Sequence, residues 1–497
     1  MNFSPLDWVI MIGYLSTTIY IGLWVRKYVE NLQGYIVAGR KIKVSLGIAT
    51  FTATELGTVT FVYFGELGYV AGFSAFIIGI LALISYTFVG KTGFIIEKLR
   101  EYGMMTIPEF YQLRFNKKVR ILGGSILFIG GVLNMGIFLK FDGIFLSEVM
   151  GFGPQAVGFI MALMLVVVMS YTILGGMFSV VVTDFMQYVV LSIAMLITTI
   201  FVLLEVDLTQ LSTAVTSNLG EGGFNPIENT RFGWSFIVWI LVTNVAAAAL
   251  WQPGTSKALS AKSPAVAKKI FWVTGLTFAG RAMIPMFWGI AALAYFGAGE
   301  STTSAMPMLL GEVLPVGFLG LLVAGLLAAS MSTYSSYVLA WSSVLTLDVL
   351  SSLKKGGYSE RKKILITRVV SGFIGLFLLV FGLWYEIPET AFQYIFITGT
   401  MYTAGALGTV TAGLYWKKAN DIGANAALIL GAIVPAGFLI LENFSETLPN
   451  WLAFFTNVNI AGMLSFVLAA LGMILGSLLT QKSNPAKLIN ESEVHYA

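Results

Sequence analysis

Long apolar stretches make up most of the chain, and short polar segments separate them. A helix that crosses a lipid bilayer needs about 20 mostly apolar residues. Thirteen stretches fit this description, near residues 6–25, 45–72, 73–90, 121–149, 156–174, 178–204, 233–251, 270–297, 314–349, 365–384, 390–415, 422–441 and 458–480. The pattern therefore predicts an all-α polytopic membrane protein with 13 transmembrane helices.

The basic residues give these predicted helices a direction. Most of the 29 Lys and Arg residues fall on one side of a thirteen-span arrangement, in segments 26–44, 91–120, 252–269 and 350–368 and after the eleventh and thirteenth spans. Lys257 is counted here as a loop residue, and the opposite side holds Arg231. Because loops rich in Lys and Arg stay in the cytoplasm, we expect an external N-terminus and a cytoplasmic C-terminus in the plasma (cytoplasmic) membrane. Lys140 and Arg281 fall within spans, where we expect structural roles.

Composition narrows the class of protein. The chain of 497 residues is 57% hydrophobic and 11% charged, whereas soluble domains carry about 25% charged residues. It has no cysteine, and its single histidine, His495, lies in the C-terminal tail, so a thiolate or histidine metal site within the spans is excluded. No nucleophile–base pair is visible, and an enzyme is the least expected function. We expect one membrane domain, 1–497, that binds no nucleic acid.

Asp184 is an acid inside an apolar stretch. An uncharged run, 188–204, follows it closely. A carboxylate at membrane depth costs roughly 2.5–3.5 kcal/mol on insertion scales, and such acids usually mark ion pathways or proton relays. A position at a water-filled helix mouth is the alternative.

The pattern of the second stretch, 45–72, predicts a broken helix. Gly57, Gly65 and Gly68 weaken it, and Glu55 and Glu66 lie beside them. Irregular backbone at membrane depth is tolerated where it faces protein or a water-filled cavity, and broken helices build the binding sites of secondary transporters. A helix with small residues for close packing is the alternative.

The ninth stretch carries a row of hydroxyl groups. Ala329, Ser332, Ser335 and Ser336 share one helix face, and Thr333 lies beside them. Hydroxyl oxygens without charge suit a weakly held monovalent cation. They can equally bond their own helix backbone or join helices.

Several motifs together resemble the sodium/solute symporter family, which includes bacterial proline, sialic acid and galactose symporters. They are the segments 171–187 and 328–336, Ala-Gly-Arg at 38–40 and Ser-Ala-Lys at 260–262. The resemblance implies the leucine-transporter fold with an inverted 5+5 repeat. Its core repeats would cover about 45–204 and 233–415, with extra helices at 6–25, 422–441 and 458–480.

The resemblance also implies two sodium sites. The main site would use backbone carbonyls at Glu55 and Thr58 with the Ala329 carbonyl and the hydroxyls of Ser332 and Thr333. The second site would use Asp184 with Ser332, Ser335 and Ser336. Candidate residues of a substrate cavity are Val62, Tyr63, Glu66, Tyr69 and Asn244, and valine at 62 counts against a galactose-like site.

These expectations combine into a sodium-coupled secondary active symporter that imports a small organic solute by alternating access. Na⁺ is the coupling ion, and an amino acid, sugar acid, sugar or carboxylate is the solute. A proton-coupled transporter of the same fold, with Glu55, Glu66 and Asp184 as proton carriers, is the first alternative. A membrane sensor or channel is the second.

Overall fold

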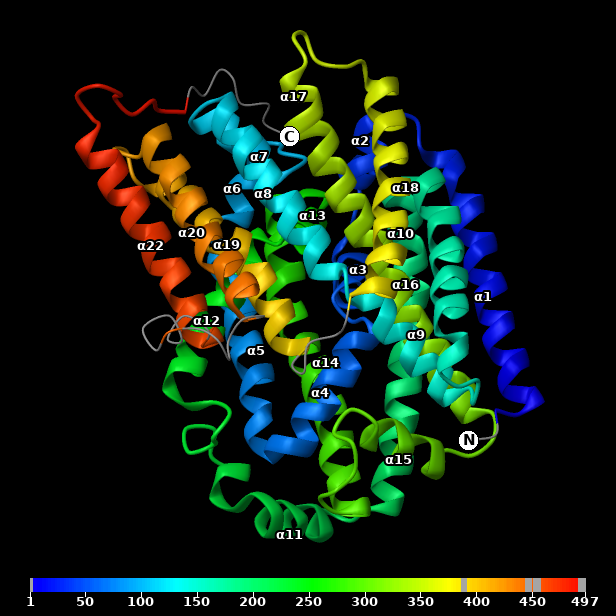
Figure 1. Cartoon of the computed structure of the whole chain (residues 1–497). Coiled ribbons are helices and arrows are strands. Elements are labelled where there is room, and N and C mark those ends of the chain that lie inside the picture. The colour runs from blue at the N-terminus through cyan, green and yellow to red at the C-terminus, as the bar shows by residue number, and fades with distance from the viewer. Residues whose placement is uncertain (1–2, 386–390, 443–448, 450–456, 490–497) are drawn as a thin grey trace.

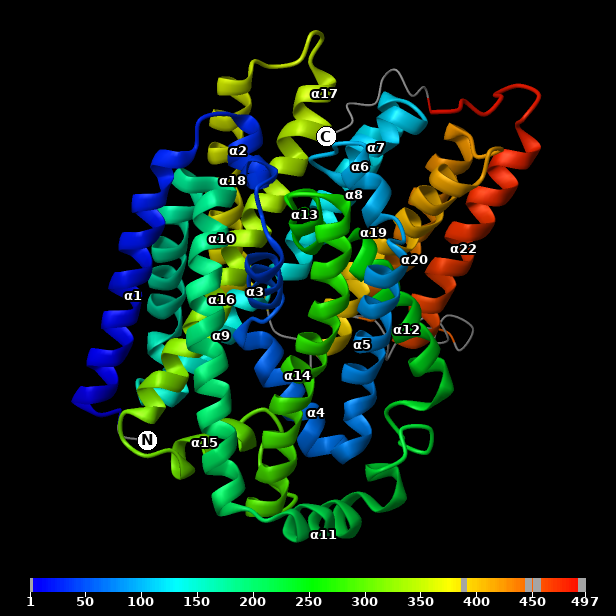
Figure 2. The same ribbon diagram turned by 180° about the vertical axis from the view of Figure 1, so that it is seen from behind.

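The computed structural model describes residues 3–385, 391–442, 449 and 457–489, and its elements are helices (Figures 1 and 2). His495 and residue 390 of the eleventh predicted stretch lie outside this range. The helices are α1 (Pro5–Val25), α2 (Leu32–Val37), α3 (Val44–Thr54), α4 (Thr58–Ala71), α5 (Ile77–Thr92), α6 (Ile96–Glu101), α7 (Ile107–Arg114), α8 (Lys117–Met135), α9 (Phe138–Val149), α10 (Val157–Glu205), α11 (Leu208–Leu219), α12 (Gly233–Leu250), α13 (Gln252–Leu259), α14 (Pro264–Phe296), α15 (Ala305–Val313), α16 (Phe318–Val344), α17 (Ser351–Leu353), α18 (Glu360–Trp384), α19 (Ala391–Tyr415), α20 (Asp421–Leu441) and α22 (Val458–Leu479).

In the described part of the chain, ten helical segments are long and apolar enough to cross a membrane. They differ in burial: only 28% of the apolar window near α1 is covered, but 89% of the window that includes α16. Outer helices carry exposed apolar side chains, such as Phe159 of α10 and Phe373 of α18. Burial therefore places α16 at the centre of the bundle and leaves apolar outer surfaces that suit lipid.

The ten segments do not settle the predicted number of spans. One of them covers Pro154–Glu205, which contains two predicted stretches. A straight helix as long as α10 would extend roughly 73 Å, more than twice the hydrocarbon core of a bilayer. Gly176 interrupts α10 with φ 52° and ψ −148°, and a Cβ there would lie 2.5 Å from the carbonyl oxygen of Tyr35. This break falls between the two stretches, and the count of 13 stays a prediction.

The connections separate toward two ends of the molecule. α2, α7 and α17 lie toward one end, whereas α11 and α15 lie toward the other (Figures 1 and 2). The first end carries most of the loops that are rich in Lys and Arg. The predicted segregation of charge is thus visible in the fold, and the direction of the chain across the membrane stays a prediction.

The predicted break in the second stretch is confirmed. α3 ends at Thr54 and α4 begins at Thr58. Glu55 has φ −97° and ψ 9°, and Gly57 is extended with φ −90° and ψ 166°. A helix end leaves its last carbonyl groups without intrahelical donors. The break therefore offers free backbone carbonyls in the middle of the bundle.

A second break, which the sequence analysis did not predict, lies at Trp251. This residue has φ −80° and ψ 110° between α12 and α13. Proline cannot continue a helix, because it lacks an N–H and clashes with the carbonyl four residues back. Pro253 lies in the first turn of α13, and the carbonyl of Ala249 accepts a 3.1 Å hydrogen bond from Thr255 Oγ1 instead.

The placement of α13 corrects the assignment of 252–269 as a loop. All eight residues of α13 are buried. Lys257, counted among the loop lysines, has no exposed surface. The prediction failed because polar Gln252, Thr255 and Ser256 interrupt the apolar pattern, although their side chains bond inside the protein.

Candidate functional site

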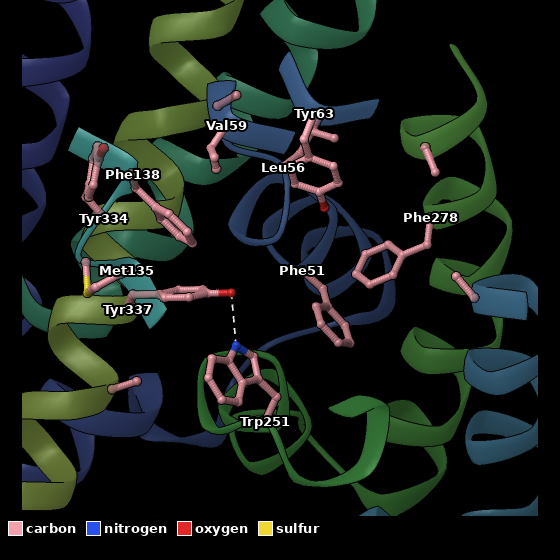
Figure 3. Close-up of a cluster of buried hydrophobic side chains, with 14 of the residues drawn as sticks. Phe51, Leu56, Val59, Tyr63, Met135, Phe138, Trp251, Phe278, Tyr334 and Tyr337 are labelled. Carbon is pink, nitrogen blue, oxygen red and sulfur yellow. Dashed lines mark hydrogen bonds between the residues drawn. The ribbon is translucent and has the colours of Figure 1, made fainter. Parts of the chain in front are cut away.

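A cavity lies beside the α3–α4 break, with about 790 Å³ of space when the open solvent at its mouth is included. Side chains from both broken helices and from α5, α8, α9, α14, α16 and α19 line it. Several aromatic groups line it: in Figure 3, Tyr337 lies between Phe138 and Trp251, and the Trp251 Nε1–H donates to the Tyr337 hydroxyl at 2.9 Å. A cavity that combines aromatic and polar side chains is typical of a site for a small organic molecule.

The described residues that line the cavity also include one acid, Glu55, and one cation, Arg281. Glu55, at the α3–α4 break, accepts a 3.0 Å hydrogen bond from the Tyr337 hydroxyl through Oε2. Its other oxygen, Oε1, is buried and has no partner among the described residues. Arg281 of α14 lies 3.9 Å from the centre of the Phe278 ring, and its Nε has no partner there either. Both groups keep hydrogen-bonding capacity for a ligand, and Arg281 lies on the cavity rather than in a purely structural position.

The predicted cavity residues divide into two groups. Tyr63 and Asn244 line the cavity. Val62 is buried elsewhere, Glu66 accepts a 2.9 Å hydrogen bond from Thr302, and Tyr69 donates to the Gly297 carbonyl at 2.7 Å. Among the described residues, these three do not belong to its lining. Val59, Thr60 and Tyr63 of α4 line the cavity, and positions 62, 66 and 69 are centred about 100° around the helix from them.

The residues predicted for the main sodium site approach one another from two elements. Thr333 Oγ1 donates to the Ala329 carbonyl at 3.1 Å on α16. A Cβ placed on Gly57 would lie 3.3 Å from that hydroxyl, so Thr333 faces the break directly. Ser332 is adjacent and fully buried. The α3–α4 break and the Thr333 hydroxyl of α16 thus lie at one junction.

Thr58 has a different place from the one predicted. It is the first residue of α4, so its carbonyl takes part in the hydrogen bonds of that helix. Its hydroxyl lies 2.8 Å from Ser330 Oγ, which also accepts from the Thr58 N–H at 3.0 Å. Thr58 therefore anchors α4 to α16, while Glu55 remains at the break.

Asp184 lies in α10 and is fully buried inside the protein. It accepts hydrogen bonds from Ser332 at 2.5 Å, from Thr54 at 3.4 Å and from Thr50. The predicted co-ligands behave differently. Ser336 lies near, 2.8 Å from Thr54 Oγ1. Ser335, however, donates to the Ser332 carbonyl of its own helix at 3.0 Å.

Lys257 is the residue that the sequence analysis missed. Its ammonium lies 3.4 Å from Asp184 Oδ2 and 3.0 Å from Ser336 Oγ. The amino group of a lysine thus lies where the second sodium ion was predicted. The sequence offered one usable signal, Pro253, which marks the start of a new helix just before Lys257.

The family model of the sodium:solute symporter family matches residues 35–431. The chain is 23% identical to the sodium/sialic acid symporter SiaT of Proteus mirabilis, over 87% of this chain and 89% of that protein. It is 24% identical to the sodium/sialic acid symporter NanT of Aliivibrio fischeri, over 86% of each.

Two solved structures share the fold. One is a Na⁺-coupled sialic acid symporter in a substrate-bound outward-open state, with a TM-score of 0.80, 20% identity and coverage of 96% of this chain and 98% of that one. The other is Mhp1, a nucleobase-cation-symport-1 family transporter, with a TM-score of 0.58, 12% identity and coverage of 93% and 98%. Because the family model matches most of this chain, residues 35–431, the chain belongs to the sodium:solute symporter family.

Proposed function

We propose that this protein imports a small organic solute together with sodium by alternating access. The observation that carries this proposal is the junction of the α3–α4 break with Thr333 of α16, at the edge of the aromatic cavity. Broken helices that meet at a midplane cavity are the usual construction of ion and substrate sites in secondary transporters. Family membership supports the coupling to sodium.

The main sodium site consists of the Glu55 carbonyl, the Ala329 carbonyl and the hydroxyls of Ser332 and Thr333. Oxygen ligands without formal charge fit a monovalent cation that must leave in every cycle. A sodium ion there links the break to α16. It favours one conformation of the transporter only to the extent that it binds that conformation more tightly.

The cavity favours a solute with charges of both signs. Among the described residues, Glu55 Oε1 has no hydrogen-bond donor and Arg281 Nε has no acceptor. An ammonium group and a carboxylate on one small molecule satisfy both, and the aromatic walls accommodate an apolar part. Among the candidate solutes, we therefore place an amino-acid-like zwitterion before sugars, sugar acids and monocarboxylates.

The membrane arrangement follows the same proposal. We assign the two segments 45–204 and 233–415 as inverted repeats. The first helix of each segment is broken, at 55–57 in one and at Trp251 in the other. The basic end of the molecule faces the cytoplasm, with the N-terminus outside and 13 crossings. This arrangement places the cavity between the repeats.

Uptake into proteoliposomes tests the function. Purified protein is given an inward sodium gradient and a panel of labelled amino acids, sialic acid, sugars and monocarboxylates, with choline replacing sodium in the control. We expect sodium-dependent accumulation of at least one zwitterion. Uptake that ignores sodium and follows a proton gradient would instead support the proton-coupled alternative. Rapid flux down a solute gradient without coupling would support a channel.

A further inference from the structure

A salt bridge between Lys257 of α13 and Asp184 of α10 lies in the interior of the protein. Neither side chain has solvent-accessible surface, and Nζ is 3.4 Å from Oδ2. Removing one partner of such a pair leaves an uncompensated buried charge, so the two groups depend on each other. Stability alone does not explain a buried lysine here, because apolar residues of the same volume pack at least as well.

Polar groups from four helices surround this pair and form a cage. α3 contributes Thr50 and Thr54, α16 contributes Ser332 and Ser336, α10 contributes Asp184, and α13 contributes Lys257. Ser336 Oγ lies 3.0 Å from the ammonium and 2.8 Å from Thr54 Oγ1. The cage therefore has a single carboxylate, a set of hydroxyl oxygens and one cation that is covalently part of the chain.

The Lys257 ammonium has the charge and the hydrogen-bond donors that a monovalent cation bound in this cage would need to replace. It carries one positive charge and three N–H donors. Two of its neighbours, Asp184 and Ser336, are within hydrogen-bond distance, and Met177 Sδ lies at 4.0 Å. A sodium ion in the same cage would share one carboxylate with the ammonium at short range in a low-dielectric interior, where like charges repel strongly.

We propose that the Lys257 ammonium is the resident cation of this cage, so that one sodium ion, bound at the main site, accompanies each solute molecule. This inference rests on the proposed sodium-coupled transport. Lys257 acts as a positioning residue, because it keeps Asp184 charged and directed toward Ser332. Ser332 donates a 2.5 Å hydrogen bond to Asp184 and is also a proposed ligand of the main site.

The number of sodium ions bound per protein tests the proposal, with ²²Na⁺ alone as the probe. Equilibrium dialysis of the purified full chain in detergent, at constant ionic strength with choline, should give one bound ion for the native protein. Two bound ions would overturn the assignment of Lys257 as the resident cation. No bound ion at all would instead contradict the proposed sodium coupling, so the two failures are distinguishable.

Variants of Lys257 test the cause. Lys257→Met removes the charge and keeps most of the length of the side chain, so the cage becomes available and the count should rise from one to two. Lys257→Arg keeps a cation and should retain a count of one. Adding Asp184→Asn to Lys257→Met removes the cage carboxylate and should return the count to one. A count of one in Lys257→Met would show that the lysine does not exclude a second ion. If Lys257→Met does not fold, the number of sodium ions bound by the native protein decides whether the proposal holds.

Discussion

The hydroxyl of Ser330 on α16 donates a 2.7 Å hydrogen bond to Oδ1 of the buried Asp142 on α9. Tyr334 donates to the other oxygen of the same carboxylate. Because Ser330 Oγ also accepts from the Thr58 N–H at 3.0 Å, this cluster joins α9 and α16 to the first turn of α4. The first turn of α4 is thus held, through Ser330, by an acid that is not among the residues of the predicted ion sites.

We expect Asp142→Ala to destabilise the protein by about 2–4 kcal/mol, because two buried hydroxyl donors lose their acceptor. Asp142→Asn keeps the shape of the side chain and one acceptor oxygen, so this variant should lose clearly less stability than Asp142→Ala. Thermal unfolding in detergent measures both. Equal midpoints for Asp142→Ala and the native protein would contradict a supporting role for this carboxylate.

Ser332→Ala should weaken sodium activation of uptake by at least about tenfold, or roughly 1.4 kcal/mol. Its hydroxyl is a ligand in the proposed main site and a donor to Asp184. The measurement is the sodium concentration that gives half-maximal uptake. Ser335→Ala is the matched control on the same helix, because its hydroxyl donates to the Ser332 carbonyl of that helix. A larger effect in Ser335→Ala than in Ser332→Ala would reverse the assignment.

Glu55→Gln should raise the KM for a zwitterionic solute by about tenfold or more while leaving sodium activation nearly unchanged. The substitution removes the charge that faces the ammonium group of the solute but keeps the backbone carbonyl proposed as a sodium ligand. A charge-assisted hydrogen bond is roughly twice as strong as a neutral one. Glu66→Gln provides the control, because Glu66 bonds Thr302 away from the cavity lining.

Arg281→Lys should also raise the KM for that solute, because lysine keeps the charge but loses the fork that matches a carboxylate. Sodium binding measured without solute should stay the same. If removing the carboxylate from the solute had no effect on its binding to the native protein, the proposed contact with Arg281 would be ruled out.

Gly289→Ala should destabilise the packing of α14 on α4 by about 3 kcal/mol, since overpacking a tight contact forces backbone shifts. A Cβ at this position would lie 1.9 Å from the Gly65 carbonyl oxygen. Gly280→Ala, on the same helix, places its Cβ in open space and should be neutral or stabilising. Thermal unfolding of the two variants side by side checks the contrast, and similar midpoints would contradict the close approach.

The sequence predicted the parts of the site that local patterns specify. An acid in an apolar run identified Asp184, and glycines among polar residues identified the break near Gly57. Trp251 and Lys257 were missed because the polar residues of α13 resemble a loop when only hydropathy is considered. Burial of Lys257 depends on Asp184, which lies 73 residues away in the chain, and no local pattern reports such a distance. The cavity role of Arg281 depends in the same way on helices that meet only in the fold.

The lysine in the cage limits how far the transporter can concentrate its solute. One sodium ion gains about 2.3 kcal/mol from a potential of 100 mV and about 1.4 kcal/mol from a tenfold concentration gradient. For a solute without net charge, the sum corresponds to an accumulation ratio of about 500, whereas a second ion would raise it to about 3 × 10⁵. By keeping a permanent charge in place of that ion, the protein consumes less of the sodium gradient in each cycle and accepts a lower ceiling on accumulation.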